Sequence, residues 1–287
     1  MTVFGELIYV FVLASVLVGL VMGWMGIRFM RPPRNHPGQF ALERARRNRP
    51  ETVVVCAGDS LTHGVVSANY VELLEERLSD DGFFFVNAGI NGDMAYNLRL
   101  RLEPIIACQP DFVTVLIGTN DVNAIMSEGN QQRYVKSNHL PREPNLEWYT
   151  SELESIVKTL QARTSAHIAI LSPPVLGEEL YTRPNRTVAT YASAARDVAR
   201  RSNVTYIPLF ELMCEELDQA GHQPLEVFED GLGRIVRASL KVLLLRQSFD
   251  AVSDAAGYYF LTDGIHLNSR GAKRVAGLIE RFLEGEG

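Results

Sequence analysis

Three residues at opposite ends of the chain have the types that ester hydrolysis requires. Ser60 lies in "VVVCAGDSLTHG", just after an apolar run that ends at Gly58, and Asp263 and His266 lie in "TDGIHLNSRGA". A serine hydroxyl is a poor nucleophile near neutral pH and needs an adjacent base, which the His266 imidazole can supply. A carboxylate on the other ring nitrogen holds that imidazole in one tautomer, and this is the role we predict for Asp263.

Two further stretches carry groups that can stabilise negative charge. "NAGINGD" contains Gly92, and "LIGTND" presents Asn120 just beyond Gly118. Attack on an acyl carbonyl places negative charge on its oxygen, so we predict an oxyanion hole from the Ser60 N–H, the Gly92 N–H and the Asn120 amide. Glycines in turns and helix-capping residues explain each stretch alone. Their combination with a serine, a histidine and an aspartate favours a serine hydrolase.

These groups need a scaffold, and the pattern between them predicts one. Strands are expected at Thr52–Ala57, Phe83–Asn87, Phe112–Gly118, His167–Leu171 and Val204–Ile207. Helices are expected at Asn69–Ser79, Met94–Leu102, Leu146–Arg163, Ala189–Arg201 and Asn268–Leu283. Alternation of apolar strands with helices predicts an α/β fold, with a mostly parallel sheet covered on both faces. Reactive groups gather at the carboxyl ends of such strands, so we expect each of the four stretches at its own strand end.

Four segments in order resemble the signature blocks of one known family. "GDSL" (58–61), "NGD" (91–93), "GTND" (118–121) and "DGIH" (263–266) are similar to the blocks of the SGNH hydrolases, also called the GDSL esterase/lipase family. The resemblance covers roughly residues 52 to 284. It implies a flavodoxin-like three-layer α/β/α fold and hydrolysis of esters or thioesters without a metal or organic cofactor. It also implies the following roles: Ser60 as nucleophile, Gly92 and Asn120 as oxyanion donors, Asp263 and His266 as acid and base.

Other polar residues near these segments have ordinary structural explanations. Asp59, Asp93 and Asp121 are expected to fix their turns by accepting backbone N–H bonds. His63, three residues after Ser60, could line the cleft, but the base rate for lone histidines favours a surface position. The three cysteines, Cys56, Cys108 and Cys214, are far apart and form neither a disulfide framework nor a zinc pattern, so we expect free, apolar side chains.

An apolar stretch precedes the predicted α/β domain. Residues 7–27 contain no charged residue, and as a helix they would span about 30 Å of hydrocarbon. The first residues lack lysine and arginine and no small-residue cleavage site follows, which favours a single-pass transmembrane anchor over a cleaved signal peptide. We therefore expect an anchor at 1–28, an extended Pro/Arg-rich tether at 29–50 and the hydrolase domain at 51–287.

The distribution of charge predicts orientation and partners. All seven arginines within residues 1–50 follow the apolar stretch, so the positive-inside rule predicts an external N-terminus and a cytoplasmic domain. The rest of the chain has 21 basic against 32 acidic residues. Such an acidic domain repels phosphate backbones, which argues against a nucleic-acid partner. The expected partners are a membrane and a small-molecule or lipid ester.

Three long connections could shape the substrate pocket: residues 122–145, 172–187 and 211–257. The last contains "GRIVRASLKVLLLRQ". As a helix, this segment would place Arg234, Arg237 and Lys241 on one side and Val236, Leu240, Leu243 and Leu244 on another. One interpretation is a helix that touches anionic lipid and admits a lipid substrate. The other, which the commonness of such stripes favours, is an amphipathic helix packed on the core.

Three functions are compatible with these observations. The main hypothesis is a membrane-anchored serine esterase or lipase, including a lysophospholipase or thioesterase, that acts through an acyl-enzyme. The second is a carbohydrate O-acetyl esterase or acyltransferase, since the same groups can pass an acyl group to or from a sugar. The third is a non-catalytic membrane adaptor with the same fold, because a fold alone does not prove activity.

Overall fold

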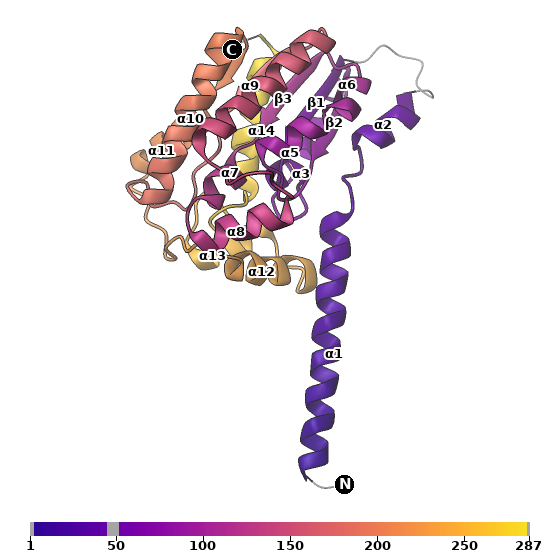
Figure 1. Cartoon of the computed structure of the whole chain (residues 1–287), viewed down its shortest axis with the longest axis vertical. Coiled ribbons are helices and arrows are strands. Elements are labelled where there is room, and N and C mark those ends of the chain that lie inside the picture. Colours follow the sequence, from indigo (N-terminus) through magenta and orange to yellow (C-terminus); the bar gives the residue numbers. More distant parts are fainter. Residues whose placement is uncertain (1–2, 45–51, 286–287) are drawn as a thin grey trace. The chain divides into compact units, whose positions relative to one another are not determined.

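The chain divides into two units, Met1–Pro32 and Pro33–Gly287. The computed structural model describes residues 3–44 and 52–285 (Figure 1). The first unit consists of helix α1 (Val3–Met30). Within α1, Phe11–Met30 is long and apolar enough to cross a membrane, a criterion that a signal sequence also meets.

The second unit is built on a five-stranded parallel sheet. Its strands are β1 (Thr52–Gly58), β2 (Phe83–Gly89), β3 (Phe112–Leu116), β4 (His167–Leu171) and β5 (Thr205–Ile207). They lie in the order β2-β1-β3-β4-β5, and every neighbouring pair is parallel. This is the flavodoxin-like order, in which the direction of winding reverses between β1 and β3. The predicted α/β fold is therefore confirmed.

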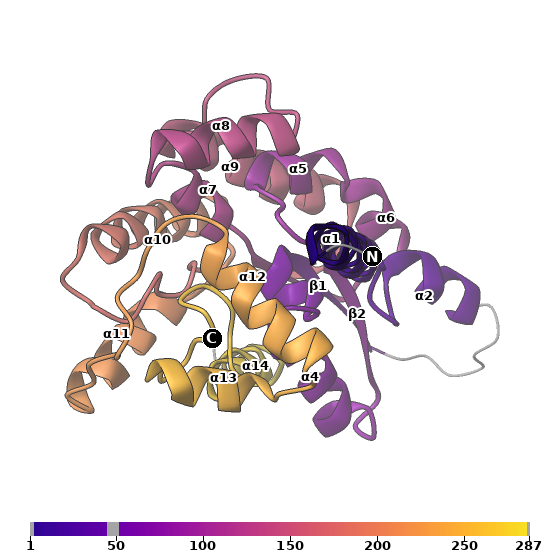
Figure 2. The same ribbon diagram turned by 90° about the horizontal axis from the view of Figure 1, so that it is seen from below.

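Helices cover both faces of the sheet, which explains the continuous apolar character of its strands. Figure 2 shows α5 (Ala95–Leu100), α6 (Leu102–Ala107) and α9 (Leu146–Arg163) on one side and α4 (Tyr70–Leu78) and α14 (Ser269–Leu283) on the other. Helix α9 buries Leu153, Ile156, Val157 and Leu160, a spacing that places them on one face. Beside it, α10 (Arg183–Ser202) packs along the same layer.

Several element boundaries differ from the prediction. Residues 94–102 form parts of two helices, α5 and α6, and α10 begins six residues earlier than expected, where Pro184 is favourable in a first turn. The connections also contain helices: α7 (Thr119–Ala124), α8 (Glu128–Ser137), α11 (Leu209–Gln219), α12 (Gly233–Ser239), the π-helical turn η1 (Leu240–Leu244) and α13 (Phe249–Ala256). Helix α12 and η1 agree with the helix considered at 233–247, whereas α11 overlaps a segment taken as part of the connection 211–257. The other helices of the connections are short, so the hydrophobic period did not mark them.

The segment expected as an extended tether contains a helix. Helix α2 (Pro37–Arg44) packs Phe40 against Phe84, and the ring centroids lie 5.1 Å apart. Before it, Asn35 binds the edge strand β2. The Asn35 carbonyl accepts from the Asn87 N–H at 3.0 Å, and its side-chain amide donates to the Phe85 carbonyl at 2.8 Å. Residues 35–44 are thus part of the second unit. Residues 45–50 of the expected tether, and residue 51 of the expected domain, lie outside the described residues.

Candidate active site

The nucleophile, base and acid predicted from the sequence form one chain of hydrogen bonds. Ser60 Oγ lies 3.0 Å from His266 Nε2, and His266 Nδ1 lies 2.8 Å from Asp263 Oδ2. The other carboxylate oxygen of Asp263 accepts the backbone N–H groups of Ile265 at 3.0 Å and His266 at 2.9 Å. All three side chains are buried. Because its remaining bonds fix the carboxylate, Asp263 can hold the His266 ring in one orientation.

The local structure at the end of β1 fixes the position of Ser60. It begins the short helix α3 (Ser60–His63), and Asp59 caps that helix by accepting the Leu61 N–H at 2.9 Å. Gly58 is needed for close approach, since an added Cβ would lie 2.2 Å from Thr62 Oγ1 and 2.4 Å from the Leu116 carbonyl oxygen. The serine therefore follows its strand without an intervening loop.

The segment with Asp263 and His266 does not follow a strand of the sheet, contrary to our expectation. It forms a turn between α13 and α14, closed by an isolated antiparallel bridge between Leu261 and Leu267. Within the turn, the Thr262 N–H donates to the His266 carbonyl at 2.7 Å. The buried Glu178 carboxylate accepts the three consecutive backbone N–H groups of residues 259–261, which anchors the approach to this turn. The other three stretches follow β1, β2 and β3 as predicted.

The predicted oxyanion donors lie on the loops after β2 and β3. Gly92 has φ +80°, a conformation that favours glycine. Asn120 lies at the start of α7, where its side-chain amide donates to the Asp93 carbonyl at 2.9 Å. The same nitrogen lies 3.4 Å from a carboxylate oxygen of Asp59. Asn120 therefore contacts the immediate neighbours of both Ser60 and Gly92, which brings the three stretches together.

Two of the three aspartates expected to fix turns accept backbone N–H groups as predicted, whereas the side chain of the third, Asp93, pairs with an arginine. Asp59 caps α3 as predicted, whereas Asp121 accepts the Ala95 N–H at 3.2 Å and so joins the loops after β3 and β2. Asp93 forms an ion pair with Arg101. That guanidinium also donates to the carbonyls of Ala88 at 2.8 Å and Gly58 at 2.9 Å. It thus ties together the ends of β1 and β2, a role that nothing in the spacing of Arg101 indicated.

The predictions for His63 and for the three cysteines have different outcomes. His63 is buried, not at the surface, because α3 packs against the end of β2 and Gly89 leaves room for the His63 backbone. The three cysteines are free, with Cys56 and Cys108 buried. Burial raises the pKa of the Cys56 thiol to about 12, which makes it a poor nucleophile. In residues 3–44 and 52–285, no group of three or more His, Cys, Asp or Glu side chains could hold a metal ion.

The electrostatics of the site suit a histidine base. Burial lowers the pKa of His266, but the negative charge and hydrogen bond of Asp263 outweigh it, and the net pKa is raised. Burial raises the pKa of Asp263, but the charge and hydrogen bond of His266, together with the backbone N–H groups of Ile265 and His266, outweigh burial, and the net pKa is lowered. The two residues thus stabilise each other's charged forms. Burial raises the pKa of Asp59 and Asp121 to about 7.

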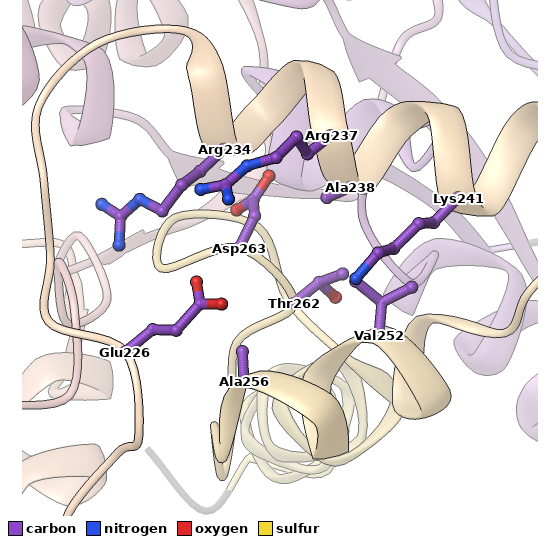
Figure 3. A pocket seen from close by; sticks show the side chains of 9 residues that line it. All are labelled: Glu226, Arg234, Arg237, Ala238, Lys241, Val252, Ala256, Thr262 and Asp263. Atoms are coloured by element: carbon purple, nitrogen blue, oxygen red, sulfur yellow. The ribbon is translucent and has the colours of Figure 1, made fainter.

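A small cavity of about 50 Å³ lies beside Asp263. Figure 3 shows Arg237 and Lys241 reaching into it from α12 and η1, with Glu226 on the opposite side. The segment 233–247 does not pack as an apolar stripe on the core. Arg234 is buried: its guanidinium donates to the Val227 and Glu229 carbonyls and to the Tyr258 hydroxyl.

The apolar side of the same segment is partly exposed. Of its four residues, Leu244 is exposed and retains 48% of its accessible surface. Two leucines outside that side are exposed as well: Leu245 retains 63%, and Leu232, just before α12, retains 50%. Burial of Arg234 is possible because backbone carbonyls satisfy its donors and because it stacks on the Phe228 ring at 4.7 Å. Arg234 is buried and Arg237 is exposed, although the pattern places both on one side, and Val236, Leu240 and Leu243 on the other side are half-buried. The amphipathic pattern therefore did not predict which residues of this segment face the protein.

The parallel sheet, with a serine, a histidine and an aspartate joined at its carboxyl edge, defines an α/β fold of the SGNH type. The chain belongs to the GDSL-like lipase/acylhydrolase family, whose model matches residues 56–274. An acetylxylan esterase of Geobacillus stearothermophilus is 29% identical over 144 residues, which are 49% of this chain and 60% of that esterase.

Solved structures show the same fold at low sequence identity. An acetyl xylan esterase superposes with a TM-score of 0.58 at 19% identity, covering 80% of this chain and 99% of the other. A lipase/acylhydrolase from Enterococcus faecalis gives a TM-score of 0.53 at 18% identity, with 81% and 95% covered.

Proposed function

We propose that this protein hydrolyses carboxylic esters through an acyl-enzyme formed on Ser60. The observation that carries the proposal is the unbroken set of hydrogen bonds Ser60–His266–Asp263. His266 Nε2 accepts the Ser60 proton as the hydroxyl oxygen attacks the acyl carbonyl, and then gives that proton to the departing alcohol. Water, activated by the same nitrogen, cleaves the acyl-enzyme and restores the serine.

One tetrahedral intermediate precedes the acyl-enzyme and another forms during its hydrolysis. In each, the negative charge on the carbonyl oxygen must be stabilised. We assign this role to the N–H groups of Ser60 and Gly92 and to the side-chain amide of Asn120. These donors lie shortly after the ends of three adjacent strands, β1, β2 and β3, which supports a common oxyanion hole. The chemistry needs no cofactor beyond these side chains and backbone groups.

A single substitution tests the proposal. Ser60→Ala should abolish hydrolysis of p-nitrophenyl esters and labelling by a fluorophosphonate probe, whereas Ser79→Ala, at an exposed serine after α4, should leave both unchanged. Full activity in Ser60→Ala would contradict the proposal. Absence of labelling and of ester hydrolysis in the wild-type protein would instead favour the non-catalytic adaptor.

A carbohydrate O-acetyl ester is the second candidate substrate. The relative from Geobacillus stearothermophilus, which is 29% identical to this chain over 144 residues, is an acetylxylan esterase. Release of acetate from acetylated xylo-oligosaccharides, compared with hydrolysis of lysophospholipids and of p-nitrophenyl esters of increasing length, separates this substrate from lipid esters. Transfer of the acyl group to an added sugar, in place of water, would identify an acyltransferase.

A membrane location forms a separate part of the proposal. The apolar length of α1 supports a single-pass anchor, and the arginines that follow it support a cytoplasmic domain. Extraction of the full chain by detergent but not by alkaline carbonate, with an intact N-terminus by mass spectrometry, is the expected result. Release by carbonate, or loss of the first residues, would indicate a soluble or processed protein.

Exposed leucines after α12 support contact with lipid. Leu244 and Leu245 are exposed beside Lys241 and Arg246, a combination that suits an anionic bilayer surface. Residues 33–287, which include the docked segment 35–44, should sediment with phosphatidylglycerol vesicles. Replacing both leucines with serine should reduce that binding, and equal binding by the two proteins would exclude this contact.

A further inference from the structure

The hydrogen bonds around Asn120 fix which way its amide faces. The Asp93 carbonyl can only accept a hydrogen bond, so the Asn120 nitrogen must be the atom that faces it at 2.9 Å. The Asn120 carbonyl oxygen then faces the opposite way, where it accepts from the Tyr134 hydroxyl at 2.7 Å. This hydrogen bond opposes rotation of the amide from its oxygen side.

The direction of the Tyr134 hydroxyl is fixed in turn by two buried asparagines. Asn123 donates its side-chain N–H to the Tyr134 oxygen at 3.1 Å. Asn130 donates to the side-chain oxygen of Asn123 at 3.1 Å and to its backbone carbonyl at 3.0 Å. Because the tyrosine oxygen already accepts a hydrogen bond, its own proton is directed at Asn120. Burial raises the pKa of Tyr134 to about 12, so the hydroxyl keeps this proton at neutral pH.

A second side chain from the same region holds the other predicted donor loop. Asn138, which ends α8 four residues after Tyr134, donates to the Gly92 carbonyl at 2.7 Å. Asn138 is itself held by a reciprocal pair of bonds with Asn97, each 3.2 Å long. Glycine has no side chain to restrict its backbone. This bond fixes the peptide unit that follows Gly92 and, through the Gly92 Cα, limits the rotation available to the preceding unit, which carries the Gly92 N–H.

We propose that Tyr134 and Asn138 are positioning residues for the oxyanion hole, Tyr134 through the Asn120 amide and Asn138 through the Gly92 backbone. This inference rests on the proposed ester hydrolysis. Tyr134 lies in the last turn of α8 and Asn138 directly follows that helix, so α8 and its C-terminal cap, within the connection 122–145, support donors on two different loops. That connection therefore acts on the transition state and does more than shape the pocket.

Tyr134→Phe in the full-length protein is the first test. The variant keeps the ring and loses only the hydroxyl, so kcat should fall by about 10- to 100-fold, the loss expected from a small misplacement of a catalytic group. The KM should be nearly unchanged, because the oxyanion forms only in the transition state. Tyr191→Phe is the matched control: its hydroxyl is buried, and no hydrogen-bond partner is found for it among the described residues. We expect wild-type kcat from it.

A double-mutant cycle separates positioning from general stabilisation. If Tyr134 acts through Asn120, adding Tyr134→Phe to Asn120→Ala should lower kcat by less than about twofold beyond Asn120→Ala alone. A structural role would lower kcat by the same factor in both backgrounds and would overturn the proposal. Asn138→Ala supplies an independent measurement should Tyr134→Phe fold poorly: kcat should again fall with little change in KM.

Each outcome has a distinct meaning. Wild-type kcat in both Tyr134→Phe and Asn138→Ala, with an active wild-type protein, overturns the positioning role and leaves the proposed function intact. A wild-type protein that hydrolyses no ester in the panel and is not labelled at Ser60 overturns both. A loss expressed in KM alone would assign these residues to substrate binding and would also overturn the inference.

Discussion

The two sides of the candidate site are built differently. On one side, Ser60, His266 and Asp263 form a linear chain of two side-chain hydrogen bonds, which we call the single file. On the other side, Asn120 and Gly92 are held by a branched network: Asn120 bonds to the Asp93 carbonyl and to Tyr134 of α8, and the Gly92 carbonyl bonds to Asn138. A single file has no substitute for a missing member, whereas a network distributes positioning over several bonds. Losses of activity should therefore be larger and more uniform on the first side.

After the abolished activity expected of Ser60→Ala, the next largest effect is expected from His266→Ala. The variant removes the base that both activates Ser60 and protonates the leaving alcohol, so kcat/KM for a p-nitrophenyl ester should fall by about 10⁴-fold or more. His167→Gln is the control, since His167 is exposed at the opposite end of the sheet, at the start of β4. A loss below tenfold in His266→Ala would mean that the single file does not carry the chemistry.

Asn120→Ala should have an intermediate effect on the same substrate. Loss of one oxyanion donor commonly costs about 10²–10³ in kcat, and the N–H groups of Ser60 and Gly92 remain. Substrate binding should change little, because the ground-state carbonyl is less charged than the oxyanion. Activity equal to that of His266→Ala would show that the two sides are equally indispensable and would remove the contrast drawn between them.

The same contrast explains what could be read from the sequence. Asp263 and His266 lie three residues apart, and Ser60 follows an apolar run, so local spacing marked them. Parallel strands then bring the ends of β1, β2 and β3 to one edge, which made Gly92 and Asn120 predictable as well. Tyr134 and Asn138 have no such marker. Their importance depends on where the short helix α8 packs, and only tertiary structure determines that.

Arg234 shows a related limit of hydrophobic patterning. An arginine opposite an apolar stripe predicts a solvent-facing residue, yet its guanidinium is buried beside the turn that holds Asp263. Two backbone carbonyls and the Tyr258 hydroxyl satisfy its donors, and these acceptors lie 5 to 24 residues away. The spacing of apolar residues along a helix carries no information about such partners. The stretch with Asp263 and His266 was wrongly predicted at a strand end for a similar reason: a polar turn after a helix and one after a strand look alike in sequence.

The pH dependence of the wild-type protein provides a finer test of the single file. Neutral His266 is needed to accept the Ser60 proton, so activity should rise as pH rises through the pKa of His266. Since Asp263 raises that pKa, the midpoint of the acid limb of kcat/KM should lie above the ordinary value of about 6.5. Residual activity of Asp263→Asn should show a midpoint at lower pH. A wild-type midpoint below 6.5 would be inconsistent with this pairing.

The smallest expected effect concerns a second buried aspartate, on the oxyanion side. Asp263 faces an imidazole and its pKa is lowered, whereas burial raises the pKa of Asp121 to about 7. Folded Asp121 therefore keeps its proton up to about pH 7, while in the unfolded chain it loses the proton near the ordinary value of 3.8. Its contribution to stability is fully present below that value and is lost as pH rises through about 7.

Asp121→Asn tests this difference, because asparagine cannot ionise and still offers an oxygen to the Ala95 N–H. The Tm of the variant minus that of the wild type should become more positive between pH 5 and pH 8. The corresponding difference for Asp80→Asn, at an exposed aspartate, should stay flat over the same range. A flat difference for Asp121→Asn as well would mean that Asp121 is ionised in the folded protein throughout, and that the network around Asn120 tolerates a buried negative charge.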